Sequence, residues 1–130
     1  MTFYIHLKGR LGNNLFGIVL ALILKKKYPS HDIKINIKWV MHYYPKDYNK
    51  ILNLFPNIKQ YVSNFNINGI KNKCNRIYTG QTLDYEDIKD NDNVLFDGFF
   101  QRTEYYEKYR DFIKSMFFKN NEKKEINEFI

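Results

Sequence analysis

The sequence predicts an α/β fold, in which parallel strands alternate with helices. Three observations lead to this expectation. A short apolar strand passes through a glycine turn into a helix that is apolar on every side, a second strand alternates apolar and polar residues, and a third, fully apolar strand leads into an amphipathic helix. A helix without a polar face must be buried, and strands that alternate with helices form a parallel sheet that the helices cover.

The N-terminal strand and helix are predicted from the residues that mark their ends. Residues 3–7 are aromatic and branched, as in a strand. After the turn, Asn13 is the expected N-cap of the apolar helix. The lysines at 25–27 lie at its negative end, and Pro29 follows.

The middle of the chain carries weaker signals. Residues 33–37 alternate strictly and are expected to form a strand parallel to the first one. Residues 39–48 are expected to form a loop that leads into a short helix at 47–54. Residues 60–62 and 76–78 are candidates for short strands.

The C-terminal part is clearer. Residues 94–96 form a buried-strand pattern that Asp97 and Gly98 end. Thr103 is the expected cap of a helix whose apolar stripe extends over residues 105–117. These elements predict a Rossmann-like parallel sheet with flanking helices, whose ligands bind beyond the carboxyl ends of the strands.

Composition bounds the function classes. The chain has 130 residues, of which 44% are hydrophobic, enough for one well-packed domain. Its net charge of +7 comes from scattered lysines, and the one run is explained by the helix end, so we expect no nucleic-acid partner. Cys74 is the single cysteine, which favours a reducing compartment. We find no signal peptide, and the apolar run at 15–24 is shorter than the roughly 20 residues of a transmembrane helix. A soluble, cytoplasmic protein is expected.

The turn after the first strand is the main candidate site. Its two glycines match neither the dinucleotide fingerprint nor the P-loop, and turn geometry alone explains them equally well. Arg10 lies between them beside a helix N-terminus, a suitable place to hold a phosphate or sugar hydroxyls. The amides of Asn13 and Asn14 can both donate and accept hydrogen bonds.

A second candidate lies after the strand at 94–96. Gln101 is near the carboxyl end of this strand, where α/β proteins place ligand-binding residues. Asp97 is the one acid well placed to be a general base, although Asp before Gly is also common in turns. His6 is expected to be a packed strand residue, so the catalytic residue stays unassigned. The expected substrate-binding residues are Gly9, Arg10, Gly12, Asn13, Asn14 and Gln101.

Two blocks of this sequence resemble a known family. The first, Gly-Arg-Leu-Gly-Asn-Asn-Leu-Phe at residues 9–16, is similar to the G-[GR]-[LF]-G-N-Q-[LM]-F/G opening of the alpha-1,2-fucosyltransferases, glycosyltransferase family 11. The second, Phe-Asp-Gly-Phe-Phe-Gln-Arg-Thr-Glu-Tyr-Tyr at 96–106, resembles the family's G-Y-[FW]-Q-S-x-x-Y-F block. Asn14 stands where the family usually has Gln, and Gly17 stands where Gln is frequent. The blocks occur in the family's order, and the resemblance extends to about residue 118.

The resemblance implies one half of a GT-B-like glycosyltransferase. That enzyme transfers fucose from GDP-fucose to a galactoside hydroxyl with inversion, without a metal or other cofactor. Residues 1–118 would be the N-terminal domain, and residues 119–130 would begin a linker toward a donor-binding domain. The family's His-x-Arg-Arg motif does not occur in this chain. We therefore expect little or no transferase activity from these residues alone. The alternatives are a non-catalytic relative that binds a glycan or nucleotide sugar, and a basic nucleic-acid binder.

Overall fold

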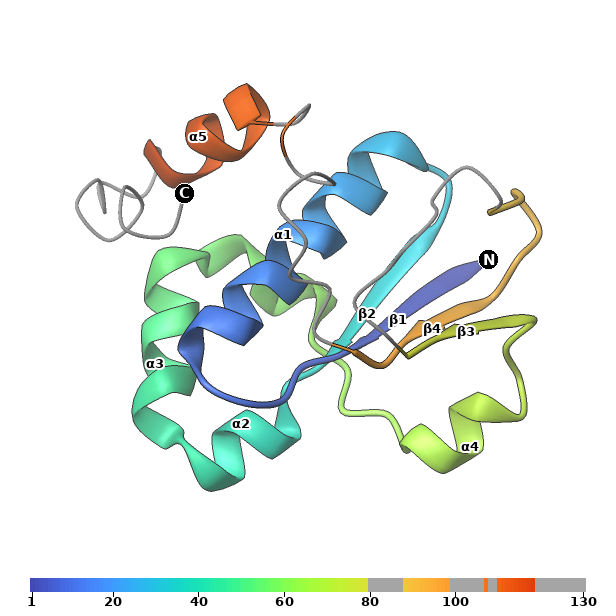
Figure 1. Ribbon diagram of the computed structural model, residues 1–130, viewed down its shortest axis with the longest axis horizontal. Coiled ribbons are helices and arrows are strands. Elements are labelled where there is room, and N and C mark those ends of the chain that lie inside the picture. Colours follow the sequence, from blue (N-terminus) through green and yellow to red (C-terminus); the bar gives the residue numbers. More distant parts are fainter. Residues whose placement is uncertain (80–87, 99–106, 108–109, 119–130) are drawn as a thin grey trace.

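The protein is an α/β domain built on a parallel sheet (Figure 1). The computed structural model describes residues 1–79, 88–98, 107 and 110–118. Within these residues the sheet has four strands, all parallel, in the order β2-β1-β4-β3. The strands are β1 (Thr2–His6), β2 (Asp32–Asn36), β3 (Arg76–Tyr78) and β4 (Val94–Phe96). The predicted α/β class with a parallel sheet and flanking helices is confirmed.

One face of the sheet forms the apolar core. The strand register places six buried residues on this face: Phe3, Ile5, Ile33, Ile35, Val94 and Phe96. The long helix α1 (Leu11–Lys27) lies across it (Figure 1). The helix is buried over most of its circumference, as its uniformly apolar sequence predicts. The first strand, the buried helix and the second strand therefore form the expected parallel βαβ unit.

The end of α1 also follows the prediction. The last turn holds Lys25, Lys26 and Lys27, and the backbone N–H of Tyr28 donates a hydrogen bond of 2.8 Å to the carbonyl oxygen of Leu24. The ammonium group of Lys25 donates hydrogen bonds to the carbonyl oxygens of Pro29 and His31, at 3.0 and 2.8 Å. The ammonium group thus provides hydrogen bonds to carbonyl oxygens of the segment after the helix, at the end of the helix where the dipole also favours a positive charge.

The segment between β2 and β3 differs from the prediction in two places. Where a loop was expected, α2 (Lys38–Tyr43) is a helix, followed at once by the predicted helix, α3 (Pro45–Leu54). Where a strand was expected at 60–62, the chain forms a 3-10 helix, η1 (Pro56–Tyr61), and only Val62 makes an isolated bridge to Ile35. The helix α4 (Ile67–Lys71) then leads to β3.

Both errors have a physical cause. The helix α2 buries a single residue, Val40, so its sequence has no apolar stripe to reveal it. The short aromatic and branched run at 60–62 fits a strand by composition. However, Pro56 begins a helical turn that brings Ile58 into the core.

The strands β3 and β4 are confirmed at 76–78 and 94–96. Residues 110–118 of the predicted amphipathic helix form α5 (Arg110–Phe118), whose Phe112 packs against the core. The ammonium group of Lys26 lies 4.4 Å from the centre of the Phe112 ring. The predicted cap Thr103, the predicted ligand residue Gln101 and the segment at 119–130 fall outside the described residues. No described helix has the length and apolar character needed to cross a membrane.

Candidate functional site

The connections between the strands diverge between β1 and β4, which are neighbours in the sheet. From β1 the chain goes through α1 to β2 on one side, and it later returns through β3 and β4 on the other side. In open α/β sheets, ligands bind beyond the carboxyl ends of the strands where the connections diverge in this way. The carboxyl end of β1 leads directly into the predicted glycine turn, and Asp97 follows the end of β4.

The glycine turn connects β1 to α1 through one residue with a positive φ. Gly9 has a φ of 84°, a backbone conformation that favours glycine. The helix begins at Leu11, with Arg10 in the N-cap position and no side-chain cap from it. The prediction that Asn13 caps this helix is therefore wrong, because Asn13 lies inside the first turn. Gly12 also lies in this turn with a helical backbone, so only Gly9 meets the expected need for a positive φ.

Asn14 is buried at 1% exposure and points into the protein. Its Nδ2 donates a hydrogen bond of 3.1 Å to the carbonyl oxygen of Gly9, which closes the turn. Its Oδ1 is buried without a hydrogen-bond partner among the described residues. Asn14 thus has a structural task, which sequence reasoning did not separate from ligand contact.

The N-terminus of α1 receives a carboxylate from a different helix. Oδ2 of Asp47, in the first turn of α3, accepts a hydrogen bond of 3.0 Å from the backbone N–H of Leu11. The same oxygen accepts from Nε of Arg10 at 2.9 Å. The guanidinium carbon of Arg10 also lies 4.4 Å from the centre of the Tyr44 ring. The hydrogen bond to Asp47 and its negative charge raise the pKa of Arg10.

Asp47 was not predicted from the sequence. It supplies, from within the domain, the kind of anion that a helix N-terminus attracts. An acid at the start of a helix that follows a proline was visible in the sequence, but its partner 36 residues away was not. The Arg10 side chain is 66% exposed, so its outer nitrogens face solvent while Nε is engaged. Ligand binding by Arg10 stays a prediction, with Asp47 as the competitor for the guanidinium.

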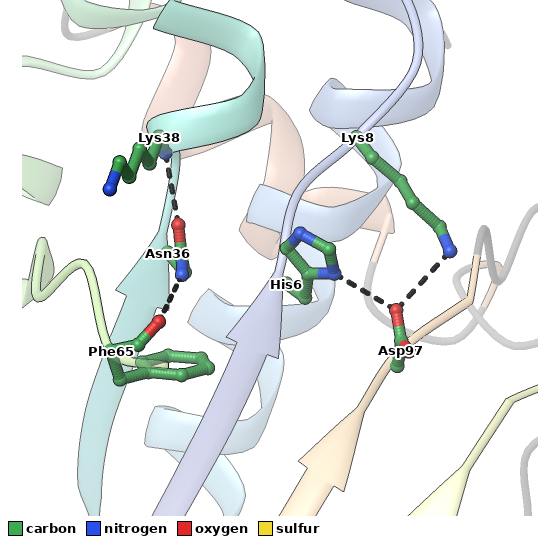
Figure 2. A network of polar contacts seen from close by, with 6 residues as sticks. All are labelled: His6, Lys8, Asn36, Lys38, Phe65 and Asp97. Carbon is green, nitrogen blue, oxygen red and sulfur yellow. Dashed lines mark hydrogen bonds and ion pairs between the residues drawn. The ribbon is translucent and has the colours of Figure 1, made fainter. Parts of the chain in front are cut away.

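A second polar group connects the ends of β1 and β4 (Figure 2). Nδ1 of His6 lies 3.0 Å from Oδ1 of Asp97, and Nζ of Lys8 lies 3.3 Å from the same oxygen. The side chains of His6 and Asp97 are only 15% and 14% exposed. Burial by itself would raise the pKa of Asp97, but the hydrogen bond from His6 and the charge of Lys8 outweigh it and lower the pKa below its ordinary value.

Asn36 holds the equivalent position at the end of β2. Its Nδ2 donates to the carbonyl oxygen of Phe65 at 2.6 Å, and its Oδ1 accepts from the backbone N–H of Lys38 at 3.0 Å (Figure 2). The backbone N–H of Ile37 donates to Oδ1 of Asn64. These bonds fix the turn from β2 into α2 and thereby set the position of the α2 side chains.

A pocket of about 260 Å³ opens between these groups. Its wall consists of side chains from the ends of β1 and β2 and from α2: His6, Asn36, Lys38, Trp39, His42 and Tyr43. The rings of Trp39 and Tyr43 lie 4.8 Å apart, and those of His42 and Tyr43 lie 4.6 Å apart. The pocket therefore combines aromatic faces with an amide, two imidazoles and one ammonium group.

No family model, curated protein or solved structure matches this chain. Among the described residues, no group of three or more His, Cys, Asp or Glu side chains could hold a metal ion.

None of the predicted binding residues that the structure describes lines the pocket. Gly9, Arg10, Gly12, Asn13 and Asn14 lie together on the turn that follows β1, as their sequence order requires. The pocket instead uses His6 from the end of β1 and the aromatic residues of α2. Sequence reasoning gave His6 a packing role and read α2 as a loop. The aromatic and histidine content of residues 39–44 was the available signal.

Proposed function

We propose that this chain is the acceptor-binding part of a glycosyltransferase that moves fucose from GDP-fucose to a galactoside hydroxyl with inversion. The observation that carries the proposal is the aromatic and polar pocket at the carboxyl ends of β1 and β2. Small-molecule sites in α/β proteins lie beyond the carboxyl ends of the strands, and they combine aromatic surface with a few polar groups that fix orientation. A sugar presents the matching chemistry, since its C–H faces are apolar and its edge carries hydroxyls.

The size of the pocket favours one sugar unit over a whole nucleotide sugar. Its volume of about 260 Å³ lies just below the range of about 300–1,000 Å³ that holds drug-sized ligands. Of its lining groups, the Asn36 amide is already used in holding the β2–α2 turn, whereas His42 and Lys38 extend from α2. We therefore assign the pocket to the terminal galactose of the acceptor.

The arrangement of the two family-like blocks supports the same proposal. The blocks at 9–16 and 96–106 begin at the ends of β1 and β4, which pair in the sheet although they are far apart in the chain. The hydrogen bond between His6 and Asp97 joins the two strand ends directly. In a GT-B-like enzyme this edge would face the donor-binding domain across a cleft.

The proposed reaction is a single displacement. The acceptor hydroxyl oxygen forms a bond to the anomeric carbon of fucose, while the bond from that carbon to the phosphate oxygen breaks and its electron pair leaves with GDP. The protein must hold acceptor and donor together and offset the growing charge on the leaving group. In this chain the Arg10 guanidinium lies beside the turn, with Nε bound to Asp47 and its outer nitrogens exposed to a ligand.

Tryptophan fluorescence provides a direct test, because Trp39 is the single tryptophan of the chain and lines the pocket. We expect methyl β-galactoside and lactose to change its emission with a saturating profile, and maltose to change it less. The substitution Tyr43→Ala should weaken the binding. Met41→Ala is the matched control, since Met41 is an exposed residue of the same helix that does not line the pocket. Equal binding of galactosides by both variants, or no binding by the wild type, would contradict the proposal.

One observation favours the second candidate, a module that binds glycans without transferring sugar. Nε of Arg10 is engaged by Asp47, whose carboxylate offsets the positive charge that the exposed outer nitrogens would offer to a pyrophosphate. Titration of GDP against wild type, Arg10→Ala and Asp47→Asn separates the two. A transferase half should bind GDP more tightly as Asp47→Asn and less tightly as Arg10→Ala. A glycan-binding module should bind galactosides but be indifferent to both changes in the GDP titration.

A further inference from the structure

The pair formed by His6 and Asp97 has a defined hydrogen-bond direction. A carboxylate can only accept, so at 3.0 Å from Asp97 Oδ1 the Nδ1 atom of His6 must carry the hydrogen. In a neutral imidazole the other nitrogen, Nε2, then has a free lone pair. The pair bridges β1 and β4, two paired strands of the sheet, so the backbone holds its geometry.

The surroundings keep Asp97 charged. Lys8 lies at 3.3 Å from the same carboxylate oxygen, and the pKa of Asp97 is lowered by His6 and Lys8 despite its burial. Asp97 therefore remains ionised far below neutral pH and stabilises a positive charge that forms on the imidazole. Among the residues that the structure describes, the other charged or titratable groups that line the pocket are Lys38, His42 and Tyr43, all on α2.

The second ring nitrogen of His6, Nε2, is not used by the contact with Asp97. Figure 2 shows the second ring nitrogen pointing away from Asp97, and His6 is one of the residues that line the pocket. A hydroxyl group bound there can donate its hydrogen to Nε2. The geometry of a base oriented by a carboxylate and open toward a ligand is that of a general base.

We propose that His6 Nε2 accepts the proton of a ligand hydroxyl bound in this pocket, with Asp97 fixing the ring and Lys8 holding Asp97 in its charged form. The identity of the hydroxyl as that of a galactoside rests on the proposed function. In the transfer step the O–H bond breaks, the proton moves to Nε2, and the oxygen electron pair forms the new bond to the anomeric carbon. The fucose–phosphate bond of the nucleotide sugar breaks at the same time.

The tautomer of His6 tests the geometry without any activity. Long-range ¹H–¹⁵N spectra of the full chain distinguish a protonated ring nitrogen from an unprotonated one. At pH 7.5 we expect His6 to carry its hydrogen on Nδ1 and Asp97→Ala to change the His6 nitrogen shifts. His42, which also lines the pocket, is the control whose shifts should not follow that change. A wild-type His6 with its hydrogen on Nε2 would overturn the proposal, whether or not Asp97→Ala folds.

The pH dependence of galactoside binding tests the proton acceptor. A protonated imidazole cannot accept a hydrogen bond, so the affinity of the wild type should be lower at acidic pH than at pH 7.5, by about three- to tenfold, the value of one hydrogen bond. His6→Gln should remove this dependence, and His42→Gln should keep it. If the dependence persists in His6→Gln, the inference about His6 fails while galactoside binding stands. If no galactoside binds at any pH, the proposed function fails, and the role of His6 fails with it.

Discussion

The carboxylate of Asp47 is the most informative single group to change, because it links two helices through one oxygen. That oxygen accepts from the Leu11 backbone at the start of α1 and from Arg10, and the Asp47 side chain is only 13% exposed. The substitution Asp47→Ala removes both bonds and the negative charge, whereas Asp47→Asn keeps an acceptor oxygen and removes only the charge.

The two substitutions should differ in cost. Loss of a capping acceptor costs about 1 kcal/mol, and loss of a negative charge at a helix N-terminus costs about 0.3–1 kcal/mol. The ion pair adds little, since the Arg10 side chain is 66% exposed and solvent screens it. We expect Asp47→Ala to lower the free energy of unfolding by about 2 kcal/mol. Asp47→Asn should lower it by less than about 1 kcal/mol, because asparagine is nearly as good a cap as aspartate.

Urea denaturation, followed by circular dichroism and by Trp39 fluorescence, measures this difference. The slope of the free energy of unfolding against urea concentration should not change, so the effect should be seen as a shift of the unfolding midpoint. Asp32→Ala is the matched control: Asp32 is an exposed acid at the start of β2, and its loss should cost less than about 0.5 kcal/mol. If Asp47→Ala costs no more than Asp32→Ala, or Asp47→Asn costs as much as Asp47→Ala, the capping argument is refuted.

Three further stability measurements probe the core and its titrating groups. A Cβ on Gly17 would lie 2.5 Å from Cδ2 of Leu7, so Gly17→Ala should destabilise the protein by about 1–2 kcal/mol. A Cβ on Gly12 would meet open space, so Gly12→Ala should stabilise the protein by about 0.5 kcal/mol. Urea midpoints of the two variants that shift in the same direction would contradict this. Burial lowers the pKa of His31, whose ring stacks on Phe3 at 4.2 Å between ring centres. As the pH drops below 6.5, His31 therefore binds a proton more readily in the unfolded chain than in the folded protein, and stability should fall. In thermal melts from pH 8 to pH 5, His31→Phe should lose that part of the pH dependence. A hydrogen bond from the Lys89 backbone and an ion pair with Arg76 lower the pKa of Asp92. The contribution of Asp92 to stability is therefore present above pH 3.8 and is lost as the pH falls through the lowered pKa. Asp92→Asn should reduce stability at pH 7 and weaken the pH dependence of acid unfolding below pH 4, and an unchanged acid unfolding curve would refute this.

The sequence alone determined the elements whose signal is local. The buried strand–turn–helix unit, the parallel partner strand, α3 and the two short strands β3 and β4 were all predicted, because apolar pattern and helix punctuation act within a few residues. The need for glycine at position 9 was also visible. The helix α2 was missed because it buries only Val40, so that tertiary contacts and the Asn36 hydrogen bonds decide its conformation rather than a periodic pattern.

The tertiary structure alone decided which side chains meet. Asp47 reaches Leu11 across 36 residues, and Asp97 reaches His6 across 91 residues, because the packing of α3 on α1 and the pairing of β4 with β1 bring them together. No short-range pattern encodes such a distance. Hence the sequence identified Arg10 and the turn as chemically suited to a ligand, while the fold assigned Arg10 a partner, gave Asn14 the task of closing the turn, and placed His6 on a pocket whose aromatic wall comes from a helix that the sequence did not reveal.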